Sequence, residues 1–199
     1  MAGLNLLLQG KPGVGKTTLV EQVVAELRGP TPAEGLPTPV RESGLRPAGG
    51  RLRVAGFTTV EVRDPAGHCL GFRVTTLAGQ PGELARIDLR SRVRVGRYGV
   101  NLEAFERLVL PELARRDIDL MVIDEIGKME CASGRFRRAL EDALDARVNL
   151  LATLGIGRLP FFQAVRERPD VELYTLTERN RPALVGEICT RLQQLVPLD

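Results

Sequence analysis

The stretch "GKPGVGKTTL", residues 10–19, constrains this chain more than any other part of its sequence. It follows a brief apolar run, and an apolar run that ends at Gly10 and Pro12 predicts a short buried strand over residues 3–8. Apolar residues then recur at helical spacing from Lys16 to Arg28, with a Gly-Pro stop directly after. The sequence therefore predicts a glycine-rich loop that joins a strand to a helix.

The loop fits the pattern G-x-x-x-x-G-K-[ST] from Gly10 to Thr17. Its glycines permit close approach of main-chain N–H groups to one anion, and the helix that begins near Lys16 adds its positive dipole end. Lys16 can reach the β- and γ-phosphates of a nucleotide, the Thr17 hydroxyl can ligate Mg²⁺, and Thr18 can contact the α-phosphate. A glycine-rich turn with an incidental lysine is the plain alternative, and the flanking strand and helix disfavour it. The nucleotide-binding residues predicted in this loop are Gly10, Lys11, Pro12, Gly13, Val14, Gly15, Lys16, Thr17 and Thr18.

A second signal is "LMVIDEIGKME", residues 120–130. A strand that ends in Asp124 and Glu125 puts two carboxylates at the carboxyl edge of a sheet, where the first loop also opens. Asp124 is suited to the Mg²⁺ shell, and Glu125 can orient or deprotonate an attacking water. Taken alone, the pair is more typical of a solvated acidic turn, but its combination with the phosphate loop favours a site. We also predict nucleotide contacts for the following Ile126 and Gly127.

Further candidates carry positive charge. Charge on the phosphoryl oxygens in the transition state calls for a cation besides Lys16, and Lys128, Arg73 and Arg97 are candidates, each against the alternative of a surface or packing charge. We favour Lys128 as the catalytic one. Asn180 and Arg181 follow the last predicted strand, where many α/β nucleotide-binding proteins contact the base or ribose; a plain helix N-terminus is the alternative.

The rest of the chain alternates between strand and helix patterns, which predicts an α/β fold with a mostly parallel central sheet flanked by helices and an inserted β-hairpin. We expect one domain over residues 1–199, with a Pro/Gly-rich loop insertion at 30–50 and the hairpin within 51–78. Asn101 and Ser133 should cap helices, and Pro111 should kink or restart the first of them. The other predicted strands are 92–100, 118–124, 148–154 and 171–177, and the other predicted helices are 135–146, 161–167 and 182–195.

Composition narrows the class of protein. Hydrophobic residues make up 43% and charged residues 27% of the 199 residues, as in an ordinary globular protein, and no apolar run approaches the roughly 20 residues that a membrane span needs. Three widely spaced cysteines fit reduced thiols, and we expect a cytoplasmic protein, with a monomer favoured. The net charge of +3 suits anionic ligands, but the arginines are spread along the chain, so nucleic acid is an unlikely partner.

Through most of its length the chain resembles the THEP-type nucleoside triphosphatases, also called cancer-related nucleoside triphosphatases. The resemblance rests on "GKPGVGKTTL", the hairpin segments "GFTTVEVRD" and "GFRVTTLAG", "RVGRYGVNLEAFE", "VIDEIGKMECASGRF" and the "NR" at 180–181. It implies a P-loop NTPase fold and Mg²⁺-dependent hydrolysis of ATP, GTP and other nucleoside triphosphates to the diphosphate, with little base preference. Carried over, residues 10–17 are the phosphate loop (Walker A), Asp124 is the metal-side acid of Walker B, and Glu125 activates water.

Two other functions remain open from the residues alone. A kinase on the same fold would use the hairpin and the arginine-rich segment 86–97 to bind a small-molecule or nucleotide acceptor of the γ-phosphate. An ATPase that binds nucleic acid would use the basic charge, although the chain has only six Phe and two Tyr for base stacking. Glu125 beside Asp124 favours hydrolysis, because a carboxylate at that place can accept a proton from water.

Overall fold

The computed structural model describes residues 3–28 and 52–194. The predicted loop at 30–50 and the end of the last predicted helix lie outside these residues. The strands are β1 (Asn5–Gln9), β2 (Val54–Arg63), β3 (Cys69–Thr76), β4 (Pro81–Arg86), β5 (Arg94–Val95), β6 (Tyr98–Val100), β7 (Leu120–Ile126), β8 (Asn149–Leu154) and β9 (Val171–Thr175). The helices are α1 (Lys16–Arg28), α2 (Leu102–Leu113), the 3-10 turn η1 (Glu130–Ala132), α3 (Gly134–Leu144), α4 (Pro160–Arg166) and α5 (Arg181–Gln193).

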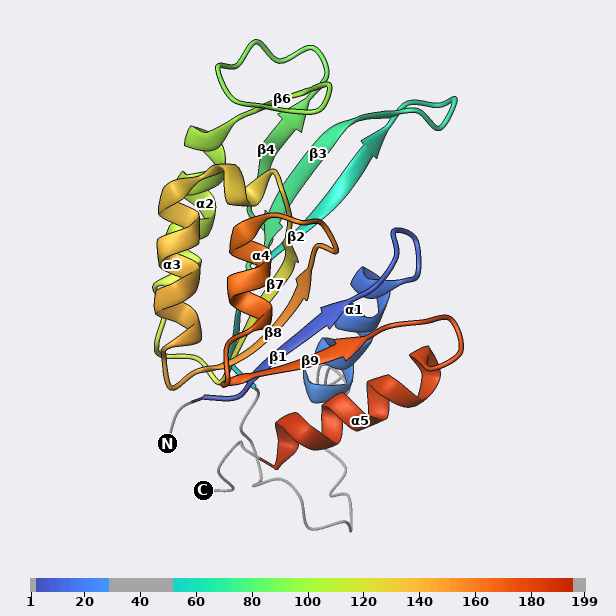
Figure 1. Cartoon of the computed structure of the whole chain (residues 1–199), viewed down its shortest axis with the longest axis vertical. Coiled ribbons are helices and arrows are strands. Elements are labelled where there is room, and N and C mark those ends of the chain that lie inside the picture. Colours follow the sequence, from blue (N-terminus) through green and yellow to red (C-terminus); the bar gives the residue numbers. More distant parts are fainter. Residues whose placement is uncertain (1–2, 29–51, 195–199) are drawn as a thin grey trace, which may run out of the picture.

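The described strands form one sheet in the order β5-β6-β4-β3-β2-β7-β8-β1-β9 (Figure 1). Its pairs from β2 to β9 are parallel, and those from β2 to β5 are antiparallel. Strand β1 lies between β8 and β9, and the chain leaves it to cross to β2 on the far side of β7. Such a reversal of strand order opens a crevice at the carboxyl ends of the strands, where the loop after β1 lies.

Helices cover both faces of the parallel half (Figure 1). Leu6 and Leu8 pack with buried residues of α1 and α5 in one hydrophobic core, and Leu7 between them packs with buried residues of α2, α3 and α4 in the other. This division follows from the pleat, since successive side chains of a strand point to opposite faces. Because both faces are covered, β1 and β7 are nearly continuous apolar runs, as parallel strands usually are. The predicted α/β class with helices on both sides of a mostly parallel centre is confirmed.

The antiparallel half differs from the prediction in extent. The hairpin β2–β3 forms at the expected place, but β2 also pairs in parallel with β7, so the hairpin is continuous with the central sheet. Strand β4, which the sequence analysis missed, and the small β5–β6 ribbon extend it further. The residues of β4 are "PGELAR", and an initial Pro-Gly pair is typical of a turn, which hid the strand.

Helix α2 begins where predicted, because Asn101 Oδ1 accepts a hydrogen bond from Ala104 N at 3.1 Å. It continues through Pro111 to Leu113, so the expected restart at that proline was wrong. Ser133 Oγ caps α3 by accepting from Phe136 N at 2.9 Å. None of the helices in the described ranges combines the length and the apolar character that a membrane span requires.

Candidate functional site

The loop between β1 and α1 is open to solvent. Lys11, Pro12 and Gly13 are exposed, and Lys16 Nζ turns back to donate to Gly10 O at 3.2 Å. Gly15 has a φ of +94°, a conformation that residues with a Cβ rarely adopt. A Cβ at this position would also lie 2.7 Å from Arg181 Nη1. The glycine therefore serves both the backbone path of the loop and the close approach of a guanidinium.

Asp124 lies in β7 with only 2% of its surface exposed. Thr153 Oγ1, from the neighbouring strand β8, donates to Asp124 Oδ1 at 2.5 Å. The other oxygen, Oδ2, is buried and has no hydrogen-bond partner in the described part of the chain. The sequence analysis ended this strand at Asp124, but β7 runs to Ile126, and its pairing with β8 is irregular between Ile123 and Ile126. The two carboxylates thus lie in a strand with a locally disrupted ladder.

Lys16 brings the two motifs together. Burial raises the pKa of Asp124, while the Thr153 hydrogen bond, the nearby Thr17 hydroxyl and the positive charge of Lys16 oppose that shift. Burial and the negative charge of Asp124 also raise the pKa of Glu125, whereas the positive charge of Lys16 lowers it. Residues of the phosphate loop and the acidic strand, about a hundred positions apart in sequence, therefore lie close to one another.

Glu130, which the sequence analysis quoted but gave no role, is 3% exposed. Thr59 Oγ1 of β2 donates to Glu130 Oε1 at 3.2 Å. Burial, together with the charges of Glu125 and Asp124, raises the pKa of Glu130 to about 8. A Cβ on Gly127 would lie 2.5 Å from Glu130 Oε2 and 2.9 Å from Glu125 Oε1, so the two carboxyl groups flank the same glycine.

The sequence analysis gave no role to Thr153 or Glu130, although both could have been found from the sequence. Thr153 is a polar residue near the carboxyl end of the apolar strand "NLLATL", and Glu130 is the acid that closes "DEIGKME". A buried polar side chain needs a partner, which makes either residue a candidate neighbour of a site.

Lys128 lies against the loop that follows β8. Its Nζ is 3.8 Å from the point where a Cβ on Gly157 would stand, and it has no ion-pair or hydrogen-bond partner within the described residues. Arg166 of α4 donates to Gly155 O and Gly157 O and to Gln9 Oε1. This arginine ties the loop after β8 to the end of β1. Ile126, between the acidic pair and Gly127, is buried in the core.

The other two predicted cations lie in the antiparallel half. Arg97 Nη2 donates to Cys69 O at 2.9 Å and to the Tyr98 hydroxyl at 3.1 Å, and its guanidinium lies 5.2 Å from the centre of the Tyr98 ring. Arg73 is exposed on β3, opposite Val60 and Glu83. The structure gives neither arginine a contact with the phosphate loop or with the acidic strand.

The loop after β9 separates the roles of Asn180 and Arg181. Asn180 Oδ1 accepts from Thr177 N at 2.8 Å and from Thr177 Oγ1 at 3.0 Å, and its Nδ2 donates to Thr175 O at 2.9 Å. Its amide is therefore engaged within the turn. Arg181, at the start of α5, extends over Gly15 of the phosphate loop.

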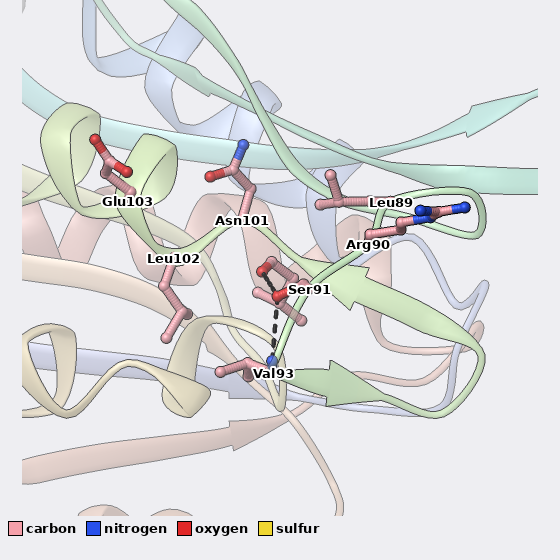
Figure 2. A pocket seen from close by; sticks show the side chains of 8 residues that line it. Leu89, Arg90, Ser91, Val93, Asn101, Leu102 and Glu103 are labelled. Atoms are coloured by element: carbon pink, nitrogen blue, oxygen red, sulfur yellow. Dashed lines mark hydrogen bonds between the residues drawn. The ribbon is translucent and has the colours of Figure 1, made fainter.

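A cavity of about 260 Å³ lies elsewhere, between the segment after β4 and the beginning of α2 (Figure 2). Ser91 lines it, and its Oγ donates to Val100 O at 2.7 Å and accepts from Val93 N at 3.1 Å. The other lining residues are Leu89, Arg90, Val93, Val100, Asn101, Leu102 and Glu103. None of the predicted catalytic or nucleotide-binding residues borders this cavity, which is lined in part by the segment 86–97, so the phosphate loop and the acidic strand remain the candidate site.

Comparison with known proteins identifies the family of the chain. A family model described as "NTPase" matches residues 48–189. The nucleoside-triphosphatase THEP1 of Thermotoga sp. (strain RQ2) is 36% identical over 192 residues, which is 96% of this chain and 96% of the relative. The human cancer-related nucleoside-triphosphatase is 35% identical over 204 residues, which is 95% of this chain and 96% of that protein.

Solved structures agree with the fold. The crystal structure of THEP1 from Aquifex aeolicus superposes with a TM-score of 0.76 at 33% identity and covers 95% of this chain and 99% of its own. The solution structure of the human cancer-related nucleoside triphosphatase gives a TM-score of 0.72 at 34% identity, with 96% and 98% covered. With its strand order, its phosphate loop and its acidic strand, this chain belongs to the THEP1-type family of P-loop nucleoside-triphosphatases.

Proposed function

We propose that this nucleoside-triphosphatase carries out Mg²⁺-dependent hydrolysis of ATP, GTP and other nucleoside 5'-triphosphates to the diphosphate and inorganic phosphate. One observation carries the proposal. The Lys16 charge acts on both Asp124 and Glu125, so a triphosphate held by the loop would lie against both carboxylates.

The residues present fit a magnesium ion. Asp124 Oδ2 is buried without a hydrogen-bond partner among the described residues, and the Thr17 hydroxyl is close enough to Asp124 to affect its pKa. A carboxylate and a hydroxyl are the oxygen ligands that Mg²⁺ uses beside phosphate. When bound, the ion would neutralise charge that develops on the β- and γ-phosphate oxygens. Thr153 would keep the Asp124 carboxylate in place for that role.

The chain's own residues would perform the hydrolysis as follows. Main-chain N–H groups of residues 10–18, Pro12 excepted, and the Lys16 ammonium hold the β- and γ-phosphates. Glu125 orients a water and takes its proton as the water oxygen bonds to the γ-phosphorus. The bond from that phosphorus to the β–γ bridging oxygen breaks, and the electron pair leaves with the diphosphate. Lys128, which has no ion-pair or hydrogen-bond partner within residues 3–28 and 52–194, would stabilise charge on the transferred group.

Broad base specificity fits the place of Arg181. A guanidinium that extends over Gly15 and stacks on the base of the bound nucleotide would not select among bases, because every base presents a π face. Asn180 would act differently, since its amide is taken up by Thr175 and Thr177. We infer that Asn180 shapes the turn from which Arg181 extends.

Glu125→Gln tests the proposal. The amide keeps the shape of the side chain but cannot take the proton, so hydrolysis should fall by about 10²-fold or more while the nucleotide stays bound. The measurement is phosphate release with ATP and GTP, with and without Mg²⁺, beside the affinity for a non-hydrolysable analogue. Normal hydrolysis by the variant would show that another group activates the water. Phosphate release that needs an added acceptor would instead support a kinase, which the names of the relatives do not favour.

A further inference from the structure

The most unusual titratable group outside the assigned chemistry is the carboxyl of Glu130. It is 3% exposed at the start of η1, the turn that directly follows β7. A buried carboxyl without a counter-charge is costly, and such a group is kept where it serves structure or function. The groups around Glu130 show whether its role is structural or functional.

Three elements supply the groups that act on Glu130. Thr59 of β2 donates to its Oε1, and Glu125 and Asp124 of β7 raise its pKa. On η1, its own main-chain N–H lowers that pKa, and its neighbour Cys131 is buried with a thiol pKa raised to about 12. The Arg137 guanidinium of α3 donates to Cys131 O at 2.5 Å, and Lys16 of α1 acts on Glu125. Glu130 is thus surrounded by two acids, a hydroxyl and a neutral thiol.

Geometry couples Glu130 to Glu125 through Gly127. Both carboxyl groups come within 3 Å of the point where a Cβ on that residue would stand, with Glu130 Oε2 at 2.5 Å and Glu125 Oε1 at 2.9 Å. Only a residue without a side chain leaves this space to the two carboxyl groups. Two carboxylates this close in a desolvated place cannot both ionise without a large penalty.

We propose that Glu130 is a positioning residue for Glu125: Thr59 fixes its place beside Gly127, where, as a neutral carboxyl group, it adds no second charge next to the Glu125 side chain that faces the attacking water. This inference rests on the proposed function of Glu125. The two acids have separate roles because Lys16 stabilises the charge on Glu125, whereas Glu130 lies among acids and neutral groups. Above the pKa of Glu130, its second charge would repel that of Glu125 and disturb the orientation of the base.

The test is the pH profile of single-turnover ATP hydrolysis at saturating Mg²⁺, from pH 6.5 to pH 9.5. Wild-type turnover should fall by about tenfold above pH 8, as Glu130 ionises. Glu130→Gln, which fixes a neutral side chain of the same shape, should lose that fall. Thr59→Val removes a hydrogen bond that favours the ionised form, so the fall should move to higher pH. These shifts are not expected from a residue whose role is only packing.

Glu106→Gln is the matched control. Glu106 of α2 accepts from the Ser133 hydroxyl at 2.6 Å beside the same turn, without contact to Glu125, so this variant should keep the wild-type profile. Superimposable profiles for wild type, Glu130→Gln and Thr59→Val would overturn the inference. So would a tenfold loss in folded Glu130→Gln at pH 7, because Glu130 would then act as an ion.

Glu125→Gln in the same series separates the two proposals. If Glu125→Gln is inactive and the Glu130→Gln profile matches wild type, only the role of Glu130 fails. If Glu125→Gln hydrolyses ATP normally, the role of Glu125 fails and the inference about Glu130 fails with it.

Discussion

Thr153 Oγ1 donates a 2.5 Å hydrogen bond to Asp124 Oδ1, and this bond leaves Asp124 Oδ2 as a buried oxygen without a partner in the described residues. The two side chains come from adjacent parallel strands, β7 and β8, near their carboxyl ends. Under the proposed function, a single hydroxyl thereby decides that Oδ2 is the carboxylate oxygen that would face Mg²⁺.

Thr153→Val should raise the Mg²⁺ concentration needed for half-maximal hydrolysis by about tenfold, since a hydrogen bond to a charged group is worth roughly 1.5–3 kcal/mol. Valine has the shape of threonine, so the core should remain packed. The measurement is a Mg²⁺ titration of phosphate release at saturating ATP. Thr153→Ser keeps the hydroxyl and is the control, and equal Mg²⁺ requirements for the two variants would contradict the orienting role.

Lys16→Ala should weaken nucleotide binding and reduce turnover by about 10²-fold or more, because it removes the charge that pairs with the β- and γ-phosphates. Binding of a fluorescent ATP analogue and phosphate release measure the two effects. Arg28→Ala is the control. It removes one positive charge from the other end of α1, and this variant should bind the analogue as wild type does. Unchanged turnover in Lys16→Ala would refute the phosphate-loop assignment.

Arg181→Ala should raise KM for ATP and GTP by a similar factor, about tenfold, because stacking of a guanidinium does not select between bases. Arg181→Lys keeps the charge but loses the planar group, and should resemble the alanine variant. The exposed Arg179, in the same loop, provides the control Arg179→Ala. An effect on one nucleotide alone would show that Arg181 reads the base by hydrogen bonds.

Glu130→Gln should change how stability depends on pH. The pKa of Glu130 is about 8 in the folded chain against 4.5 when unfolded, so the folded state holds a proton that the unfolded state releases. The stabilisation is complete below pH 4.5 and is lost as pH rises toward 8, by up to about 1.4 kcal/mol per pH unit. Chemical denaturation at pH 5 and pH 8 should show Glu130→Gln gaining stability over wild type at the higher pH. A constant difference at both pH values would contradict the raised pKa.

Local sequence was enough for the elements whose causes are local. The Asn101 and Ser133 caps each depend on an amide three residues away, and the residues that form α1 carry their own apolar period. The predicted restart at Pro111 was wrong, because the residue that follows in the last turn, Leu113, is buried in the core, so that packing holds α2 together past the proline. Cytoplasmic location, the monomeric state and the lack of nucleic-acid binding remain predictions.

The sequence by itself determined the phosphate loop and the acidic pair, because each is a contiguous motif whose strand and turn are set by neighbouring residues. Only the tertiary structure decided which distant groups meet there: Thr153 on Asp124, Arg181 over Gly15, and Thr59 on Glu130. These contacts depend on strand order, which no local pattern specifies. Burial in the folded core then sets the pKa values that separate one carboxyl group from another.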